Sequence, residues 1–262
     1  MSVASDQLTR AAELLFDAHR LAIPISPLTQ TYPGLTVGDA YAIQRLNLAR
    51  HLQGGAVLCG HKIGLTSAPM QQLLGVDEPD FGYVLDDMVL ADGATVPVGT
   101  LCAPRVEPEV AFRIRVPLRG PGVSAADVMA ATEAVAPALE IVDSRIADWR
   151  ITLADTIADN ASSGAVVLGE WVPIAEAPRL PDSTATLTVN DSTVDSGEGA
   201  SVMGDPATAV AWLANALAAY DIAIDAGQIV MSGSYTTAAF VVGGDRASAH
   251  LSGLGTVTVA FE

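Results

Sequence analysis

Apolar side chains recur at helical spacing in two segments near the start of the chain. Residues 5–20 place their leucines and alanines on one stripe, which predicts an amphipathic helix. A second helix is expected from Thr36 onward, because Thr36 and Asp39 form a capping-box pattern ahead of another apolar stripe. The intervening residues 22–34 contain three prolines, which predicts an extended connection. We therefore expect a small helical subdomain over residues 1–55.

From residue 56 onward the pattern changes to short apolar runs broken by turn-forming residues. The runs do not alternate regularly with helices, which disfavours a doubly wound sheet or a (β/α)8 barrel. We expect an α+β domain over residues 56–262, built on a rolled or sandwiched mixed β-sheet. The predicted strands cover residues 56–65, 82–90, 94–98, 106–116, 137–143, a hairpin around Asn190 and Asp191, 228–234 and 255–262, and the predicted helices cover residues 67–75, 124–134 and 206–224, with a loop at 77–82.

Composition limits the partners and the location. The chain has 262 residues, half of them hydrophobic, so it can bury a large core around an enclosed site. Its 13 lysines and arginines against 30 aspartates and glutamates give a net charge of −17, which argues against nucleic acid and anionic membrane surfaces. No signal peptide is expected, and the alanine-rich segment 206–224 contains Asp221, so we expect a cytoplasmic protein without a membrane span.

The stretch "APRVEPEVAF" places two like charges on one face of a predicted strand. Side chains two residues apart in a strand point the same way, so Glu107 and Glu109 are about 7 Å apart along one face. On a buried face, two such carboxylates need a cation, a proton or an arginine. Glu140 is a third carboxylate in an apolar strand. Together the three favour Mg²⁺, Mn²⁺ or Ca²⁺ over zinc, with exposed edge positions or pairing to Arg105 and Arg145 as alternatives.

Lys62 stands in an apolar strand between Gly60 and Gly64. It either extends to the surface or occupies a polar pocket, where the glycines would let backbone and ligand approach closely. Buried near a metal, its pKa would fall and it could transfer protons. We interpret the neighbouring His61, which points to the opposite face, as a structural or rim residue. Asp80 falls in the predicted loop, where aspartate is most often a turn former.

Two polar loops and two cysteines are further candidates. The loops around Ser162 and Ser234 either satisfy their own backbone or bind a substrate carboxylate through hydroxyl and N–H groups. Cys59 and Cys102 form no CxxC pair, and we expect both to be reduced, buried and apolar in character. The chain contains no GxSxG motif, Walker loop or dinucleotide-binding glycine motif, so serine-esterase, NTPase and dinucleotide functions have no support.

Several of these stretches together resemble one enzyme family. "GHKIGLTS…QQLLGVDEPDFG", "PRVEPEVAF", "ALEIVDSRIADW" and "DTIADNASSG" occur in the order found in the 2-keto-4-pentenoate hydratase and 4-oxalocrotonate decarboxylase branch of the fumarylacetoacetate hydrolase superfamily. The resemblance implies a fumarylacetoacetase-like β-roll after a small helical region. It also implies Mg²⁺ or Mn²⁺ held by Glu107, Glu109 and Glu140. Lys62 matches the active-site lysine of the family, and Asp80 matches an acidic position typical of the hydratases.

The resemblance implies chemistry on a small 2-oxo or 2-hydroxydienoate substrate. A 2-oxo acid can chelate a hard cation, which then stabilises an enolate. In a hydratase, 2-hydroxypenta-2,4-dienoate or a substituted analogue ketonises and adds water to give 4-hydroxy-2-oxopentanoate. Lys62 would transfer protons there, and Asp80 would position or deprotonate the water. In a decarboxylase, 2-oxohex-3-enedioate instead loses its remote carboxylate, and no water is activated.

Asp80 decides between these two activities. "VDEPDFGYVLDDM" resembles the hydratases, because decarboxylase relatives tend to carry an apolar residue at the position of Asp80, whereas "YPGLTVGDAYAIQ" and "RGPGVSAADV" resemble the decarboxylases about as much. Since Asp80 bears on mechanism, we favour a hydro-lyase of aromatic (meta-cleavage) or sterol ring catabolism. A C–C hydrolase is disfavoured because no histidine is evident to activate water.

Two non-enzymatic alternatives and an assembly state complete the expectations. The chain could be a weakly active stabilising partner of a homologous pathway enzyme, although the intact Lys62 and glutamates argue against that as its sole role. A structural protein with surface acids is disfavoured by the order of the motifs. The resemblance further implies a homo-oligomer.

Overall fold

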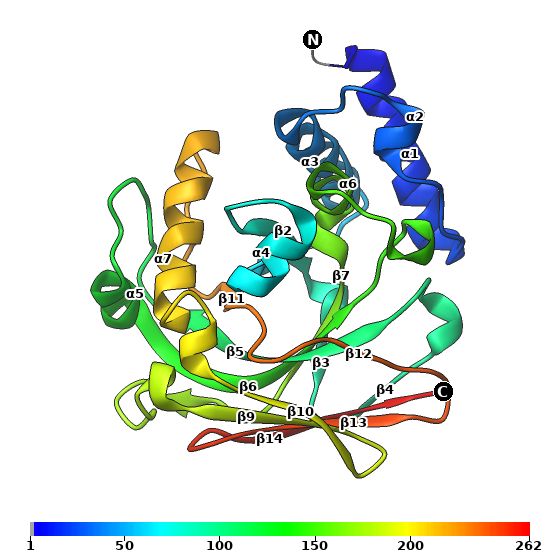
Figure 1. Ribbon diagram of the computed structural model, residues 1–262. Helices are drawn as coiled ribbons and strands as arrows, with labels where there is room; N and C mark the ends of the chain where they lie inside the picture. Colours follow the sequence, from blue (N-terminus) through cyan, green and yellow to red (C-terminus); the bar gives the residue numbers. More distant parts are fainter. Residues whose placement is uncertain (1–2) are drawn as a thin grey trace.

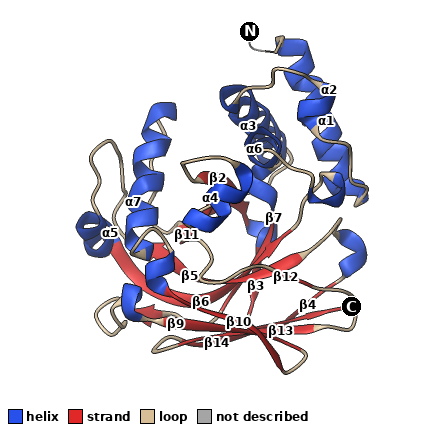
Figure 2. Ribbon diagram, in the orientation of Figure 1, coloured by secondary structure: helices blue, strands red, loops and turns tan. Residues whose placement is uncertain are grey.

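The computed structural model describes residues 3–262, so the first two residues of the predicted subdomain 1–55 lie outside it. Two layers of strands lie on one side of the molecule, and most of the helices lie on the other (Figures 1 and 2). The two predicted N-terminal helices are confirmed as α1 (Ser5–Leu21) and α3 (Val37–Gln53). Asp39 N–H donates to the Thr36 hydroxyl, and the Asp39 carboxylate accepts from Thr36 N–H, so the capping box is confirmed.

The connection between these helices is not wholly extended as predicted. It contains the short helix α2 (Leu28–Thr31), which begins directly after Pro27. A proline fits the start of a helix, because the first turn has no intrahelical acceptor for its N–H.

The strands form two mixed sheets, which confirms the predicted α+β class with a rolled or sandwiched sheet. The larger sheet has the order β2-β1-β11-β5-β6-β7-β3, with β12 beside β5 and β8 beside β6. Its strands are β1 (Leu58–Gly64), β2 (Asp80–Leu85), β3 (Val89–Ala91), β5 (Arg105–Ile114), β6 (Thr132–Val142), β7 (Ser163–Leu168), β8 (Val172–Pro173), β11 (Ile229–Met231) and β12 (Ala239–Phe240).

The smaller sheet has the order β10-β9-β13-β14-β4 and lies against the larger one (Figure 1). Its strands are β4 (Ala94–Val96), β9 (Thr184–Val189), β10 (Ser192–Glu198), β13 (Arg246–Leu251) and β14 (Gly255–Phe261). The predicted hairpin is confirmed, because Asn190 and Asp191 connect β9 to β10 with positive φ angles. The remaining helices are α4 (Ala68–Leu74), α5 (Ala125–Ala131), α6 (Leu153–Ala158) and α7 (Pro206–Leu217).

The long central strand β5 has two chemically different faces. Val106, Val110 and Phe112 point to one side, where they join the main core with apolar residues of the smaller sheet such as Leu187 and Val257. The alternate positions point to the other side and carry Arg105, Glu107, Glu109 and Ala111. We call this second side of the larger sheet the site face. Packing on one side thus fixes which residues the strand presents on the other.

Several expectations were wrong in detail. The predicted loop at 77–82 ends earlier, because Asp80 begins the buried strand β2. β6 begins at Thr132 instead of residue 137, and α5 is correspondingly shorter. Strands β7 and β13 and helix α6 were not predicted. The segments of β13 and α6 mix alanine with polar residues and give a weak apolar signal, and β7 offers only the short apolar run 165–168.

Two further expectations concern the cysteines and the membrane. Cys59 and Cys102 are free, as predicted, but both are half-buried, whereas we expected them to be fully buried. Within residues 3–262 no helix is both long and apolar enough to cross a membrane.

Candidate active site

The structure brings Glu107, Glu109 and Glu140 together on the site face. Glu107 of β5 lies directly opposite Glu140 of β6 in the antiparallel ladder, and Glu109 follows two residues later. One carboxylate oxygen from each residue lies within 4.8 Å of the others. Glu109 and Glu140 have no exposed surface, whereas Glu107 is half-buried. The two like charges of the strand therefore share a face with a third.

Most oxygens of this cluster have no hydrogen-bond donor among residues 3–262. Glu109 accepts one bond, 2.8 Å long, from Gly233 N–H. Its other oxygen and both oxygens of Glu140 are buried without a hydrogen-bond partner among the described residues. Burial and the neighbouring carboxylates raise the pKa of Glu109 well above its usual range and that of Glu107 to about 7. Crowded, unpartnered carboxylate oxygens fit a hard divalent cation.

Lys62 reaches this cluster from β1. Its ammonium donates a 2.8 Å hydrogen bond to the Ala161 carbonyl and forms an ion pair with Glu140, with Nζ 3.4 Å from Oε1. The side chain is buried, so it does not extend to the surface. We expected the pKa of a buried Lys62 to fall. Burial does lower it, but Glu140, Asp80 and Glu109 outweigh burial, and the pKa is raised above its usual value.

Asp80 lies beside Lys62 on the site face. It begins β2 opposite Gly64 of β1, two residues after Lys62. A Cβ atom at Gly64 would overlap the Asp80 carboxylate, so this glycine permits the close approach that its position in the sequence suggested. Oδ1 of Asp80 is buried without a hydrogen-bond partner among the described residues. Burial raises the pKa of Asp80, although the Lys62 ammonium partly offsets the effect.

The carbonyl that holds Lys62 belongs to an unusual loop between α6 and β7. Asn160, Ala161 and Ser162 have φ angles of 55°, 50° and 53°, three consecutive left-handed residues that are not glycine. Such conformations cost on the order of 1 kcal/mol each, so neighbouring contacts must stabilise the loop. The Asn160 amide exchanges hydrogen bonds of 2.8 and 3.0 Å with the backbone N–H and C=O of Tyr83.

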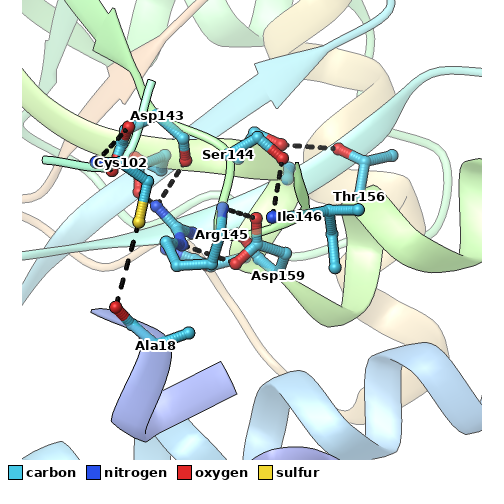
Figure 3. Close-up of polar contacts among 12 residues, drawn as sticks. Ala18, Cys102, Asp143, Ser144, Arg145, Ile146, Thr156 and Asp159 are labelled. Carbon is cyan, nitrogen blue, oxygen red and sulfur yellow. Dashed lines mark hydrogen bonds and ion pairs between the residues drawn. The ribbon is translucent and has the colours of Figure 1, made fainter. Parts of the chain in front are cut away.

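Arg145 holds the same loop in place through its guanidinium. Its guanidinium pairs with the Asp159 carboxylate, and it also donates to the carbonyls of Asp143, Asp159 and Ser163. Figure 3 shows Arg145 directed at Asp159, with Cys102 close to Asp143. The pair is buried. Arg145 therefore supports the loop instead of pairing with the glutamate cluster, which was one of the alternatives.

The other candidate residues have local contacts. The Ser162 hydroxyl lies 3.3 Å from that of Thr156, and the Ser234 hydroxyl donates to the Thr236 carbonyl of its own loop. Substrate binding by Ser162 and Ser234 stays a prediction. His61 is buried on the face opposite Lys62 and lies across from Tyr83. Burial lowers its pKa to about 4, which agrees with a neutral structural histidine.

No sequence pattern indicated the geometry of this loop, because the Arg145–Asp159 pair and the contact of Lys62 with the Ala161 carbonyl join segments that are distant in the sequence. A cavity of about 540 Å³ borders the outer side of this loop. It lies between α1, α3 and β2 and is lined by Phe16, His51 and Tyr83, among others. Residues of the site-face cluster do not line it, so it is separate from the predicted chemistry.

Comparison with known proteins shows the family of this chain. Residues 46–262 match the family described as "Fumarylacetoacetate (FAA) hydrolase C-terminal". The chain belongs to this family. The 2-hydroxyhexa-2,4-dienoate hydratase from Comamonas testosteroni is 43% identical to this chain over 249 residues, which are 94% of each chain. A 2-keto-4-pentenoate hydratase from Paraburkholderia xenovorans (strain LB400) is 42% identical over 259 residues, covering 98% of this chain and 95% of the relative.

A solved structure of the same family has nearly the same fold. The 4-oxalocrotonate decarboxylase from Pseudomonas putida G7, complexed with magnesium and adipate, superposes with a TM-score of 0.95. It is 33% identical and covers 99% of both chains. The expected family and the fumarylacetoacetase-like fold are thereby confirmed.

Proposed function

We propose that this protein is a metal-dependent hydro-lyase that hydrates 2-hydroxypenta-2,4-dienoate, or a substituted analogue, to 4-hydroxy-2-oxopentanoate. The observation that carries the proposal is Asp80, a buried carboxylate beside Lys62 on the site face. Relatives named as hydratases, at 42% and 43% identity, support it further, because the decarboxylase structure is more distant at 33%. Decarboxylation of 2-oxohex-3-enedioate is the alternative activity.

Glu107, Glu109 and Glu140 would hold Mg²⁺ or Mn²⁺, since three carboxylates converge there and oxygens of Glu109 and Glu140 are buried without a hydrogen-bond partner among the described residues. When bound, the cation supplies a Lewis acid for a 2-oxo acid. Three carboxylates alone do not distinguish the two ions.

Lys62 and Asp80 would perform the proton transfers. In the metal-free protein the neighbouring carboxylates raise the pKa of Lys62, so Nζ carries a proton there, and in the proposed reaction it would donate a proton to a substrate carbon. The raised pKa of Asp80 makes its carboxylate a better base, suited to orienting water and accepting a proton from it. The unpartnered Oδ1 is the acceptor available for that water. A cytoplasmic location remains a prediction from the sequence, and a homo-oligomer and a complex with a homologous pathway enzyme remain predictions from the resemblance.

Matched variants test these roles. Lys62→Met and Asp80→Asn should each lower kcat for dienoate hydration by about 10²- to 10⁴-fold, as expected for loss of a general acid or base. Neither removes a proposed ligand, so Mn²⁺ binding measured by titration calorimetry should persist. An unchanged kcat in either variant would remove that residue from the mechanism.

A further inference from the structure

Arg105 is a cation on the site face that has no role in the proposed reaction. It precedes Glu107 by two residues in β5, at a spacing of about 7 Å. Its guanidinium lies between two aromatic rings, with Cζ 4.2 Å from the ring centre of Trp149 and 4.0 Å from that of Phe240. β12 places Phe240 there by pairing directly opposite Arg105. Contact with two rings restricts where the guanidinium can lie.

The hydrogen-bonding groups of this guanidinium are left available. Within residues 3–262 Arg105 forms no ion pair, and its Nε is buried without a hydrogen-bond partner. Arg145 shows the contrast, because its guanidinium is saturated by carbonyls and Asp159. A buried N–H without an acceptor is unfavourable, so a ligand that supplies an acceptor would gain affinity there. Phe240 is 64% exposed, and its ring covers the Arg105 guanidinium, which explains why an aromatic side chain stands at this exposed position.

The register of the sheet places the backbones of Arg105 and Lys62 at opposite ends of the glutamate series, and the Lys62 side chain reaches back to Glu140. Lys62 lies opposite Met231 of β11, and Met231 lies opposite Ala111 of β5. Along β5 the order is therefore Arg105, Glu107, Glu109 and then the level of Lys62. Asp80 lies on the Lys62 side, because it pairs with Gly64.

This order orients a bound substrate. Lys62 and Asp80 are proposed to act on the carbons distant from the acid group. A 2-oxo acid would chelate the cation held by the glutamates through its 1-carboxylate and 2-oxo oxygen, so this carboxylate would lie at the glutamates, and Arg105 stands two residues from Glu107 on the same face. A planar guanidinium with unpaired N–H groups is suited to bidentate recognition of a carboxylate.

We propose that Arg105, held between Trp149 and Phe240, binds the 1-carboxylate of the 2-oxo or 2-hydroxydienoate substrate. The proposal rests on the proposed function, since it uses the roles given to Lys62 and Asp80. It assigns Arg105 to substrate binding and to no proton transfer.

Titration calorimetry with pyruvate on the Mn²⁺-loaded protein tests this assignment. Pyruvate has a 1-carboxylate and no remote group, and pyruvamide is its uncharged counterpart. Arg105→Met should weaken pyruvate binding roughly 10- to 100-fold, the range expected for one charge-assisted pair, and pyruvamide binding by less than about threefold. Mn²⁺ affinity should not weaken, because removing a cation cannot reduce attraction for another; retained Mn²⁺ binding also shows that the variant is folded.

Arg113→Met is the matched control. Arg113 lies on the same strand and also stacks on a tryptophan, with Cζ 4.6 Å from the ring centre of Trp171, but it is paired with Glu133. Its loss should leave pyruvate binding unchanged.

Three results with Arg105→Met would overturn the assignment. Its binding of pyruvate and of pyruvamide could be weakened equally, or neither could be weakened. Alternatively, only its binding of the diacid 2-oxoadipate could be weakened, which would place a remote carboxylate at Arg105. Failure of the proposed function is distinguishable from these. Wild-type protein that binds pyruvate through Arg105 but does not hydrate the dienoate would refute the hydratase proposal and leave this assignment standing. Wild-type protein that hydrates the dienoate, with Arg105→Met binding pyruvate normally, would refute this assignment alone.

Discussion

At the scale of single residues, the site face combines acids that repel one another with cations that offset them. Glu109 and Glu140 are fully buried, yet most of their oxygens lack hydrogen-bond donors among the described residues. Raised pKa values are the physical consequence of this crowding, because protons replace the missing positive charge. A cation would serve the same purpose more strongly.

Replacing one glutamate tests the cluster directly. Glu109→Gln keeps the shape of the side chain but removes one anionic ligand, so Mn²⁺ affinity should fall by at least about 100-fold and turnover should fall with it. The melting temperature of the metal-free protein should not decrease, because a crowded buried charge is removed. Glu133→Gln, at an exposed position of β6, is the control. Full turnover of Glu109→Gln in metal-limited buffer would contradict the assignment.

The pH dependence follows from the same groups. The pKa of Glu107 is about 7 in the folded metal-free protein, against 4.5 ordinarily, so between these values the folded state keeps a proton that the unfolded chain releases. The free energy of unfolding of the metal-free protein should therefore decrease as pH rises from 4.5 to 7. Metal affinity should increase over the same window, because the cation displaces the proton. Calorimetry near pH 5.5 and pH 8 measures both the affinity and the released protons; tighter binding at the lower pH would be inconsistent with this account.

At the scale of elements, the loop between α6 and β7 connects the core to the site. Its left-handed residues present the Ala161 carbonyl to Lys62, while Asn160 bonds to β2 and Asp159 pairs with Arg145. The position of the ammonium thus depends on an arginine that does not contact the glutamates.

Arg145→Met should destabilise the protein by about 3–5 kcal/mol, because it leaves Asp159 buried without its partner. Urea denaturation measures this change. Turnover should fall as well, since the Ala161 carbonyl loses its support, whereas Mn²⁺ binding to the folded fraction should persist. Arg150→Met is the control, because its pair with Asp148 is exposed. A loss of less than about 1 kcal/mol in Arg145→Met would show that the loop does not depend on this pair.

The elements with strong local signals were the predictable ones. The capping box of Thr36 and Asp39 and the Asn190–Asp191 turn act through neighbouring residues, and both are found where the sequence placed them. Asp80 was placed in a loop because turn-forming residues surround it, whereas its strand forms through pairing with β1, which no local pattern encodes. Arg105 and Arg145 were both considered as partners of the glutamates. Their actual contacts, two aromatic rings and Asp159, come from distant segments.

At the scale of the whole molecule, the residues that pack the core and the residues that form the site lie on opposite sides of the larger sheet. One side of β5 packs against the smaller sheet, and the other carries the acids and cations of the site. The order of motifs along the sequence was sufficient to predict this fold and the glutamate cluster. The direction in which a substrate lies across the cluster required the register of β1, β11 and β5.

The most direct test of the central claim offers the purified, Mg²⁺-loaded protein two substrates separately, 2-hydroxypenta-2,4-dienoate and 2-oxohex-3-enedioate, while dienoate absorbance and CO₂ release are followed. The account predicts loss of the dienoate with formation of 4-hydroxy-2-oxopentanoate, and no CO₂ from the diacid. Release of CO₂ with accumulation of the dienoate would contradict it, and would show that the buried carboxylate of Asp80 does not make this site a hydratase.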